Sequence, residues 1–489
     1  MKKNETFELE ITDYSGEGLG IGRQEGFVWF VKDTVIGDRI LASATKVKKN
    51  YGFARLLKIL SPSDDRVPAA CTLARRCGGC QLQEMSYAAQ LKFKSEKVYN
   101  NLLRIGEVGK DILDRVFEPI VGMKMPYRYR NKAQFPISRD KSGKLIAGFY
   151  AGRTHDVISC EDCLLGIPEN QEILRRVLAW MESYHIEPYD EKSGRGVVRH
   201  VLIRKGFASG QIMVCLVVNA RKLPESEALI RDLCMNTEPN VDNSPGAEDI
   251  SLKENGKSTE FRGILHVDSL SFSINTERSN VIMGREIVHL YGPGYIEDAI
   301  GSVRFRISPL SFYQVNPVQT EQMYGAALEF AGLQGQENVW DLYCGIGTIS
   351  LFLSQRAKKV YGVEIIPAAI EDAKENARLN GIDNAEFYVG AAEDVLPEWY
   401  AAHPEERIDV VSVDPPRKGC DERCLSTIVS MAPEKIVYVS CDSATLARDV
   451  KYLRAQGYEL RRVRPVDNFC QTAHIETCVL LMRASGGDA

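Results

Sequence analysis

The chain has 489 residues, of which 44% are hydrophobic and 26% charged, a balance typical of globular proteins. This composition excludes a largely disordered protein, a collagen-like fibre and a small disulfide-stapled scaffold, and at ~150 residues per domain the length predicts roughly three domains. The formal net charge of -5 gives no global indication of nucleic-acid binding, although a local basic face stays compatible with it.

No stretch approaches the ~18 consecutive apolar residues of a membrane-spanning helix. Acidic residues, beginning at Glu5, follow Met1-Lys2-Lys3 where a signal peptide would carry its apolar segment. We therefore expect no export signal, a cytoplasmic location and no membrane partner. No motif indicates a protein partner.

Residues 1–60 are predicted to form a small β-barrel domain. Short strands are indicated by the alternating segment Phe7-Glu-Leu-Glu-Ile and by Gly26-Phe-Val-Trp-Phe-Val, with a glycine-rich turn between them. The stretch Lys46–Lys58 contains five basic residues, no acidic residue and two aromatic ones. Such a mixture suits phosphate neutralisation and base stacking, but a solvated edge strand would carry the same residues.

The thirteen cysteines fall into two kinds. Cys71, Cys77 and Cys80 lie close together in a glycine-rich stretch without predicted secondary structure, which indicates a metal site. Cys160 or Cys163 would supply a fourth ligand. Zinc bound by four cysteines usually shows two paired C-x2-C knuckles, so three clustered cysteines and a remote one favour an iron–sulfur cluster over zinc. Scattered cysteines in apolar surroundings are expected to be buried small hydrophobes: Cys215, Cys234, Cys344, Cys420, Cys424, Cys470 and Cys478.

Residues 61–300 are predicted to form a central α+β domain that carries the clustered cysteines. Its segment 236–257 is polar and rich in Pro, Gly, Asn, Asp and Ser, which predicts a surface loop without chemistry.

Residues 301–489 alternate between apolar strands and helical stretches, which predicts an α/β domain with a doubly wound parallel sheet. The ligand of such a sheet binds at the carboxyl ends of its strands. The predicted strands are Val339-Trp-Asp-Leu-Tyr, Val360-Tyr-Gly-Val-Glu, Phe387-Tyr-Val, Val410-Val-Ser-Val-Asp and Ile436-Val-Tyr-Val-Ser.

Glycines and acidic residues at successive strand ends predict a cofactor site. Asp341-Leu-Tyr-Cys-Gly-Ile-Gly allows the backbone to approach a ligand closely, and Glu364, 19 residues after Gly345, suits a ribose diol. NAD and S-adenosylmethionine both fit this pattern. Ser350 replaces the third glycine of the dinucleotide fingerprint, and a further acid, Asp414, ends another strand, so S-adenosylmethionine is favoured.

The turn Asp414-Pro-Pro-Arg-Lys-Gly argues against two classes of methyl acceptor. Methyltransferases that act on exocyclic amines place a base-stacking aromatic residue after a similar turn, and Arg417 stands there instead. RNA cytosine-C5 enzymes place a cysteine just after the proline, whereas Cys420 lies too far along.

Cys441 and Glu476 are the candidate catalytic residues. Cys441 ends a predicted strand just before a helix, whose N-terminal dipole favours a thiolate, although a buried structural cysteine is the ordinary alternative. Glu476 stands directly before the last predicted strand and can reach the same crevice. Thiolate addition at carbon 6 of uracil activates carbon 5 toward a sulfonium methyl group, and a base must then remove the proton from carbon 5. The pair therefore fits uracil-C5 methylation.

Together these motifs resemble the bacterial 23S ribosomal RNA uracil-C5 methyltransferases of the RumA type, over nearly the whole chain. The closest likeness is to the Gram-positive type that modifies two uridines with one enzyme. The matching segments are Gly18-Leu19-Gly20-Ile21-Gly22-Arg23 and Gly26-Phe-Val-Trp-Phe-Val of a TRAM domain, Tyr129-Arg-Asn-Lys-Ala-Gln, Arg199-His200, Ser311-Phe-Tyr-Gln-Val-Asn-Pro, Asp414-Pro-Pro-Arg-Lys-Gly, Val439-Ser-Cys and Thr472-x-His-x-Glu.

The resemblance implies a TRAM barrel, an iron–sulfur central domain and a class I (Rossmann-like) methyltransferase domain. It also implies methylation of 23S ribosomal RNA with Cys441 as nucleophile and Glu476 as base. By position, the residues that would bind S-adenosylmethionine are Gln314, Tyr343, Glu364 and Asp414.

A [4Fe-4S] cluster on Cys71, Cys77, Cys80 and a remote cysteine is implied by the same resemblance. The family's remote ligand stands directly before a short apolar run, as Cys163 does before Leu164-Leu165. Cys163 is therefore the expected fourth ligand, and Cys160 a buried residue of a preceding strand.

The chain departs from the family at two places. Asp442-Ser443 stands where the family has Asn-Pro, and a carboxylate beside the thiol is expected to raise the thiol pKa. Cys470-Gln471-Thr472 replaces Pro-His-Thr close to the expected base, which is expected to alter substrate fit.

Two other functions are compatible with parts of the sequence. A small-molecule or protein methyltransferase could use the same sheet, but it would need neither the basic barrel nor the basic patch Lys124–Lys132 with its tyrosines. An iron–sulfur RNA-binding protein without catalysis is supported only by Asp442-Ser443.

Overall fold

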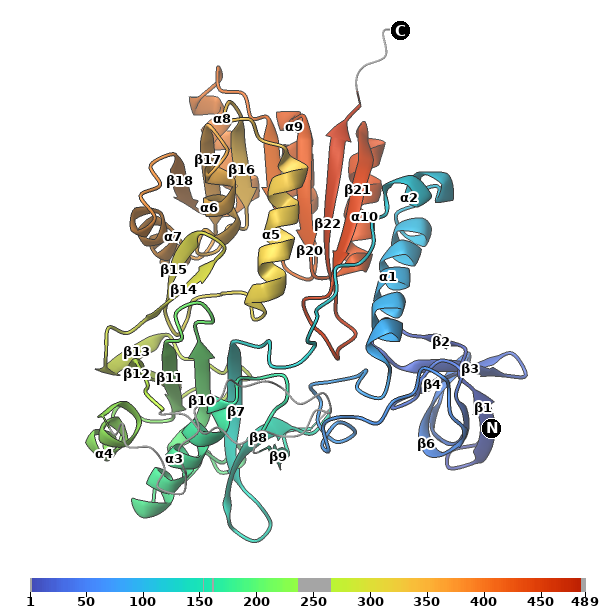
Figure 1. Cartoon of the computed structure of the whole chain (residues 1–489), viewed down its shortest axis with the longest axis vertical. Coiled ribbons are helices and arrows are strands. Elements are labelled where there is room, and N and C mark those ends of the chain that lie inside the picture. Colours follow the sequence, from blue (N-terminus) through green and yellow to red (C-terminus); the bar gives the residue numbers. More distant parts are fainter. Residues whose placement is uncertain (1, 153, 161, 236–264, 485–489) are drawn as a thin grey trace.

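A computed structural model describes residues 2–152, 154–160, 162–235 and 265–484. Three large sheets build the molecule, with the C-terminal sheet above the central sheet and the N-terminal sheet in Figure 1. The predicted polar loop at 236–257 lies outside the described residues. Among the described residues, no helix combines the length and the apolar character that crossing a membrane requires.

The N-terminal sheet has six strands in the order β1-β5-β6-β4-β3-β2. They are β1 (Thr6–Glu10), β2 (Asp13–Tyr14), β3 (Gly20–Gln24), β4 (Phe27–Val31), β5 (Arg39–Val47) and β6 (Tyr51–Ser61). The sheet curls around the buried Trp29, and Gly52 is required there, because a Cβ at this position would lie 2.3 Å from the indole ring. The predicted small β unit is confirmed.

The central sheet has seven strands in the order β13-β12-β11-β10-β7-β8-β9. They are β7 (Lys132–Arg139), β8 (Leu145–Tyr150), β9 (Val157–Ser159), β10 (Val198–Lys205), β11 (Ile212–Val218), β12 (Ser269–Ile274) and β13 (Glu286–Tyr291). The helices α3 (Glu169–Ser183) and α4 (Ser226–Ile230) share a core with this sheet, and a short π-helix, Arg231–Met235, follows α4. The apolar side of α3, including the buried Trp180, packs into this core.

The C-terminal sheet is the predicted doubly wound sheet, in the order β18-β17-β16-β19-β20-β22-β21. Its strand β22, the last strand of the chain, runs antiparallel to both of its neighbours. Its strands are β16 (Asn338–Leu342), β17 (Lys359–Glu364), β18 (Ala385–Val389), β19 (Val410–Val413), β20 (Lys435–Ser440), β21 (Tyr458–Val466) and β22 (Glu476–Arg483). The Rossmann-like α/β fold class is confirmed. The strands are Val-rich because helices cover both faces of the sheet.

Helices from two parts of the chain cover one face of this sheet. Helices α8 (Ala392–Ala402), α9 (Glu422–Met431) and α10 (Ser443–Ala455) share one core, and α5 (Pro317–Ala331), α6 (Thr348–Ser354) and α7 (Pro367–Leu379) share the other with the hairpin β14 (Ile296–Ile300) and β15 (Val303–Ile307). The helices α1 (Tyr87–Arg104) and α2 (Lys110–Val116) join the first core beside α10, as Figure 1 shows. Residues between the barrel and the central sheet thus pack on the C-terminal sheet.

Candidate active site

The candidate nucleophile and base face each other at the carboxyl edge of the C-terminal sheet. Ser440 of β20 pairs with Thr477 of β22 in antiparallel register. Cys441 follows Ser440 directly and Glu476 precedes Thr477 directly, so both residues stand at the same end of this strand pair, and the Glu476 carboxylate is close enough to act on the Cys441 thiol. Because β22 runs antiparallel, its first residue stands at the same edge as the residue that follows β20.

The environment of Cys441 and Glu476 favours their protonated forms. Burial, with the carboxylates of Glu476 and Asp414, raises the pKa of the Cys441 thiol to about 12, against the opposing effect of Arg417. Burial also raises the pKa of Glu476 well above its ordinary value, and Asp414 adds to this rise while Arg417 opposes it. One Glu476 oxygen, Oε2, is buried without a hydrogen-bond partner. The protonation states of Cys441 and Glu476 therefore depend on each other and on the charges of Asp414 and Arg417.

The predicted influence of Asp442 on the thiol needs correction. Asp442 is the N-cap of α10, where its Oδ1 accepts hydrogen bonds from the backbone N–H groups of Ala444 (2.9 Å) and Thr445 (3.0 Å). Burial, Glu476 and Asp414, in that order, account for the raised pKa of Cys441. The helix does begin beside Cys441 as predicted, with Asp442 as its N-cap.

The acidic residues at neighbouring strand ends line up beside this pair. Asp341 is fully buried, accepts a 2.5 Å hydrogen bond from the Ser350 hydroxyl, and has its pKa raised to about 7 by burial. Asp414 follows β19 and has its pKa raised to about 7 by burial and by Asp341. The Asp341 Oδ1 atom has no hydrogen-bond partner. Buried carboxylates of this kind suit a cationic ligand.

Glu364, the last residue of β17, faces the glycine turn. Its carboxylate accepts hydrogen bonds from the backbone N–H groups of Gly345 (3.3 Å) and Ile366 (3.0 Å). Gly345 has φ +55°, and the space where its Cβ would stand is open. The exposed Ile365 and Ile366 offer an apolar surface next to the carboxylate, a pairing that suits a nucleoside. This apolar surface was not predicted from the sequence, although two isoleucines directly after an acidic residue at a strand end could have indicated it.

The other two expected cofactor residues, Tyr343 and Gln314, are partly buried and buried, respectively. Tyr343 adopts a left-handed backbone (φ 65°), and its ring packs on the core beside Cys424. Gln314 is buried, and its Oε1 accepts a 3.4 Å hydrogen bond from Asn468. The buried Tyr324 of α5 also belongs to this region, because Asp414, Asp341 and Glu476 all raise its pKa, after burial itself. No local sequence pattern marks Tyr324.

The clustered cysteines and Cys163 lie in one neighbourhood. Burial raises the pKa of the Cys80 thiol to about 12, with Cys163, Cys77 and Cys71 adding to the rise. Cys80 and Cys163 pack against the same small apolar cluster. Among the described residues, no three or more His, Cys, Asp or Glu side chains form a site for a metal ion. The seven scattered cysteines are all buried, as predicted.

A groove of about 1820 Å³ runs between the barrel and the central sheet. Barrel aromatics line it at Phe30 and Phe53, whose rings lie 5.5 Å apart, and Tyr51 stands 5.8 Å from both. On the opposite side, Arg199 lies over the Tyr189 ring at 4.3 Å. Aromatic faces and guanidinium groups along one groove suit single-stranded nucleic acid.

Comparisons with known proteins match the N-terminal and the C-terminal regions of the chain to two protein families. The TRAM domain matches residues 2–57, and the tRNA (Uracil-5-)-methyltransferase family matches residues 295–484. An uncharacterized RNA methyltransferase of Clostridium tetani is 45% identical over 98% of this chain and 97% of its own length. One from Halalkalibacterium halodurans is 46% identical over 98% of each chain.

A solved structure is similar over the whole length. It is the crystal structure of Pyrococcus abyssi tRNA (uracil-54, C5)-methyltransferase in complex with S-adenosyl-L-homocysteine, with a TM-score of 0.74 and 25% identity. The similarity covers 97% of this chain and 99% of that one.

Proposed function

Because the chain belongs to the RNA (uracil-5-)-methyltransferase family with an N-terminal TRAM domain, we propose that it methylates carbon 5 of a uridine in 23S ribosomal RNA. The observation that supports this proposal is that Cys441 and Glu476 stand at one end of the β20–β22 pair, where Asp414 raises the pKa of both side chains. Uracil-C5 chemistry requires a nucleophile and a base on one substrate ring, and this pair supplies both. The reaction would take place in the cytoplasm.

The chemistry of the pair follows from the reactivity of uracil. The Cys441 thiolate forms a bond to carbon 6, and the electron pair released at carbon 5 takes the methyl group. S-adenosylmethionine supplies that methyl group from its sulfonium centre and leaves as S-adenosylhomocysteine. Glu476 then removes the proton from carbon 5, the bond between sulfur and carbon 6 breaks, and the thiolate is regenerated.

The residues around the strand ends fit S-adenosylmethionine. Burial raises the pKa of Asp341 and Asp414, and the cationic sulfonium and ammonium groups of the cofactor would favour the ionised form of these carboxylates. The Glu364 carboxylate would hold the ribose diol, while Gln314 and Tyr343 complete the expected set. A bound cation would offset the Asp414 charge, which raises the pKa of both Cys441 and Glu476, so cofactor binding would favour the thiolate and the ionised base that the reaction requires.

The cysteine neighbourhood is the proposed place of a [4Fe-4S] cluster, held by Cys71, Cys77, Cys80 and Cys163. Support comes from the shared packing of Cys80 and Cys163 and from the influence of the Cys163, Cys77 and Cys71 thiols on the pKa of Cys80. No step of methyl transfer needs an electron, so these residues would have a structural role.

Iron content tests the cysteine assignment. Cys163→Ser is expected to remove most iron from protein purified without oxygen, because it deletes a ligand, whereas wild type should hold about four irons per chain. Cys160→Ser is the matched control, since Cys160 lies close to the same cysteines but is a buried residue directly after β9, where its backbone N–H donates to the Ala147 carbonyl of β8. Zinc without iron in the wild type, or iron loss from Cys160→Ser alone, would contradict the assignment.

Ribosomal and transfer RNA are separated by one assay. Transfer RNA is the second candidate, because the similar solved enzyme acts on it by its own description. Purified protein and labelled S-adenosylmethionine would be given 23S ribosomal RNA from a strain lacking this enzyme, or tRNA lacking 5-methyluridine. We expect label in ribosomal RNA, while label in tRNA alone would contradict the ribosomal assignment.

A further inference from the structure

The loop that leads into Glu476 joins β21 to β22 and covers residues 467–475; it is called the β21–β22 loop below. Val466 pairs with Glu476, so the two ends of the loop meet at the candidate base. The conformation is not one that the segment would choose alone, since Gln471 has a positive φ of 67° without being glycine. Surrounding groups must therefore hold it.

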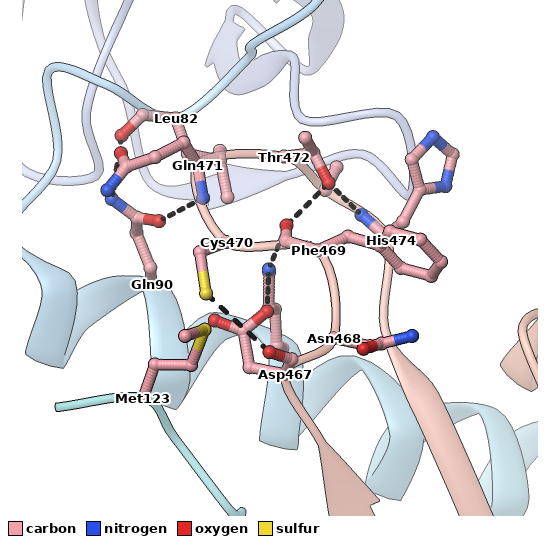
Figure 2. Close-up of polar contacts among 12 residues, drawn as sticks. Leu82, Gln90, Met123, Asp467, Asn468, Phe469, Cys470, Gln471, Thr472 and His474 are labelled. Carbon is pink, nitrogen blue, oxygen red and sulfur yellow. Dashed lines mark hydrogen bonds and ion pairs between the residues drawn. The ribbon is translucent and has the colours of Figure 1, made fainter. Parts of the chain in front are cut away.

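Groups from distant parts of the chain bind the backbone of this loop. Gln319 donates to the Asp467 carbonyl (3.2 Å) and Asn316 to that of Asn468 (3.1 Å). Other groups that donate to carbonyls of the loop are Lys94 to Phe469 (3.0 Å), Tyr129 to Cys470 (2.9 Å), the N–H groups of Gln81 and Leu82 to Gln471 (3.0 and 3.1 Å), and Lys97 to Ala473 (2.9 Å). Figure 2 shows Gln90 and Leu82 beside Gln471.

Lys94 makes the deepest of these contacts. Its ammonium lies 2.5 Å from the Asp467 carboxylate, and both side chains are completely buried. It is one of the buried residues of α1, one turn from Gln90 and Val98, at a position where an apolar residue would pack. The second Asp467 oxygen accepts a 3.0 Å hydrogen bond from Tyr87. A buried charge pair of this kind is weak evidence for added stability, because desolvation of the two charges offsets much of their attraction, so a role in fixing the geometry of the loop is the better hypothesis.

We infer that the buried Lys94–Asp467 pair anchors the β21–β22 loop, which makes Lys94 a positioning residue for Glu476. The inference rests on the proposed role of Glu476 as base. Lys94 touches no reacting atom, and it acts through Asp467 and the Phe469 carbonyl at the start of the loop. Helix α1, outside the C-terminal sheet, would thereby control removal of the proton from carbon 5.

Lys94→Met removes the anchor, and Lys92→Met is its matched control, because Lys92 lies on the same helix with an exposed side chain. In Lys94→Met, hydrogen–deuterium exchange of peptides over residues 467–476 should be faster than in wild type. In single turnovers, methyl transfer should continue, while release of methylated RNA from the protein should slow about tenfold or more. Lys92→Met should match wild type in both measurements.

Equal slowing of methyl transfer and release would overturn the inference, as would unchanged loop exchange. Should Lys94→Met fail to fold, Tyr87→Phe removes a hydroxyl that donates to Asp467, lies 3.6 Å from the Cys470 Sγ of the same loop and accepts from the Met123 N–H. It should shift both measurements in the same direction by a smaller amount, and unchanged exchange and release in it would overturn the inference. Glu476→Gln in the same assay keeps the two hypotheses apart. Absence of a methylated adduct there would refute the base, whereas loop exchange in Lys94→Met reports on the anchor independently.

Discussion

Cys441→Ala is expected to abolish covalent capture of an RNA in which 5-fluorouridine replaces the target uridine. The thiolate adds to carbon 6 and carbon 5 takes the methyl group, but fluorine occupies the place of the proton that the base would remove. Wild-type protein should therefore remain attached to the RNA when S-adenosylmethionine is present. Turnover on ordinary RNA should fall by at least ~10³-fold in the variant, because the step that activates carbon 5 is lost.

A denaturing gel with labelled RNA measures this capture with and without S-adenosylmethionine. Cys234→Ala is a suitable control, since Cys234 is a buried cysteine of the central core and should leave the cross-link intact. A cross-link that persists in Cys441→Ala would assign the nucleophile to another residue.

Glu476→Gln is expected to separate methyl transfer from proton removal. Glutamine preserves the shape of the buried side chain but cannot accept the proton, so methylated RNA should accumulate bound to Cys441. The substitution also removes a carboxylate that raises the thiol pKa, so adduct formation itself should not slow. Turnover should drop by ~10²–10⁴-fold, the range for loss of a general base.

Mass spectrometry of the trapped complex identifies the methyl group on the bound uracil. Glu459→Gln serves as the control, because Glu459 lies exposed on neighbouring β21. Wild-type turnover in Glu476→Gln would refute the role of this residue as base.

The strands of the C-terminal sheet could be predicted because their apolar runs are local and regular. Cys441 and Glu476 could be proposed as the catalytic pair for the same reason, since each stands at the end of such a run and the ends of neighbouring strands meet. The N-cap role of Asp442 was also within reach, because an aspartate before a helical stretch is a frequent start signal. From the sequence, only the effect of the Asp442 charge on the thiol pKa was considered.

Contacts between distant segments left no such signal. Lys94 and Asp467 are 373 residues apart, and a lysine on a helix ordinarily indicates a solvated face. Tyr324 likewise reaches the acidic group only because α5 packs across the C-terminal sheet. The packing of α1 and α5 on this sheet, rather than any local pattern, determines these positions.

The position of the transferred methyl group tests the central proposal most directly. Purified protein would be incubated with unmodified 23S ribosomal RNA and S-adenosylmethionine that carries a deuterated methyl group, and the RNA would then be digested to nucleosides. The proposal predicts that mass spectrometry finds the deuterated methyl group in 5-methyluridine, at a level that Cys441→Ala does not reach. Label in a methylated adenosine, guanosine or cytidine, with none in 5-methyluridine, would contradict it.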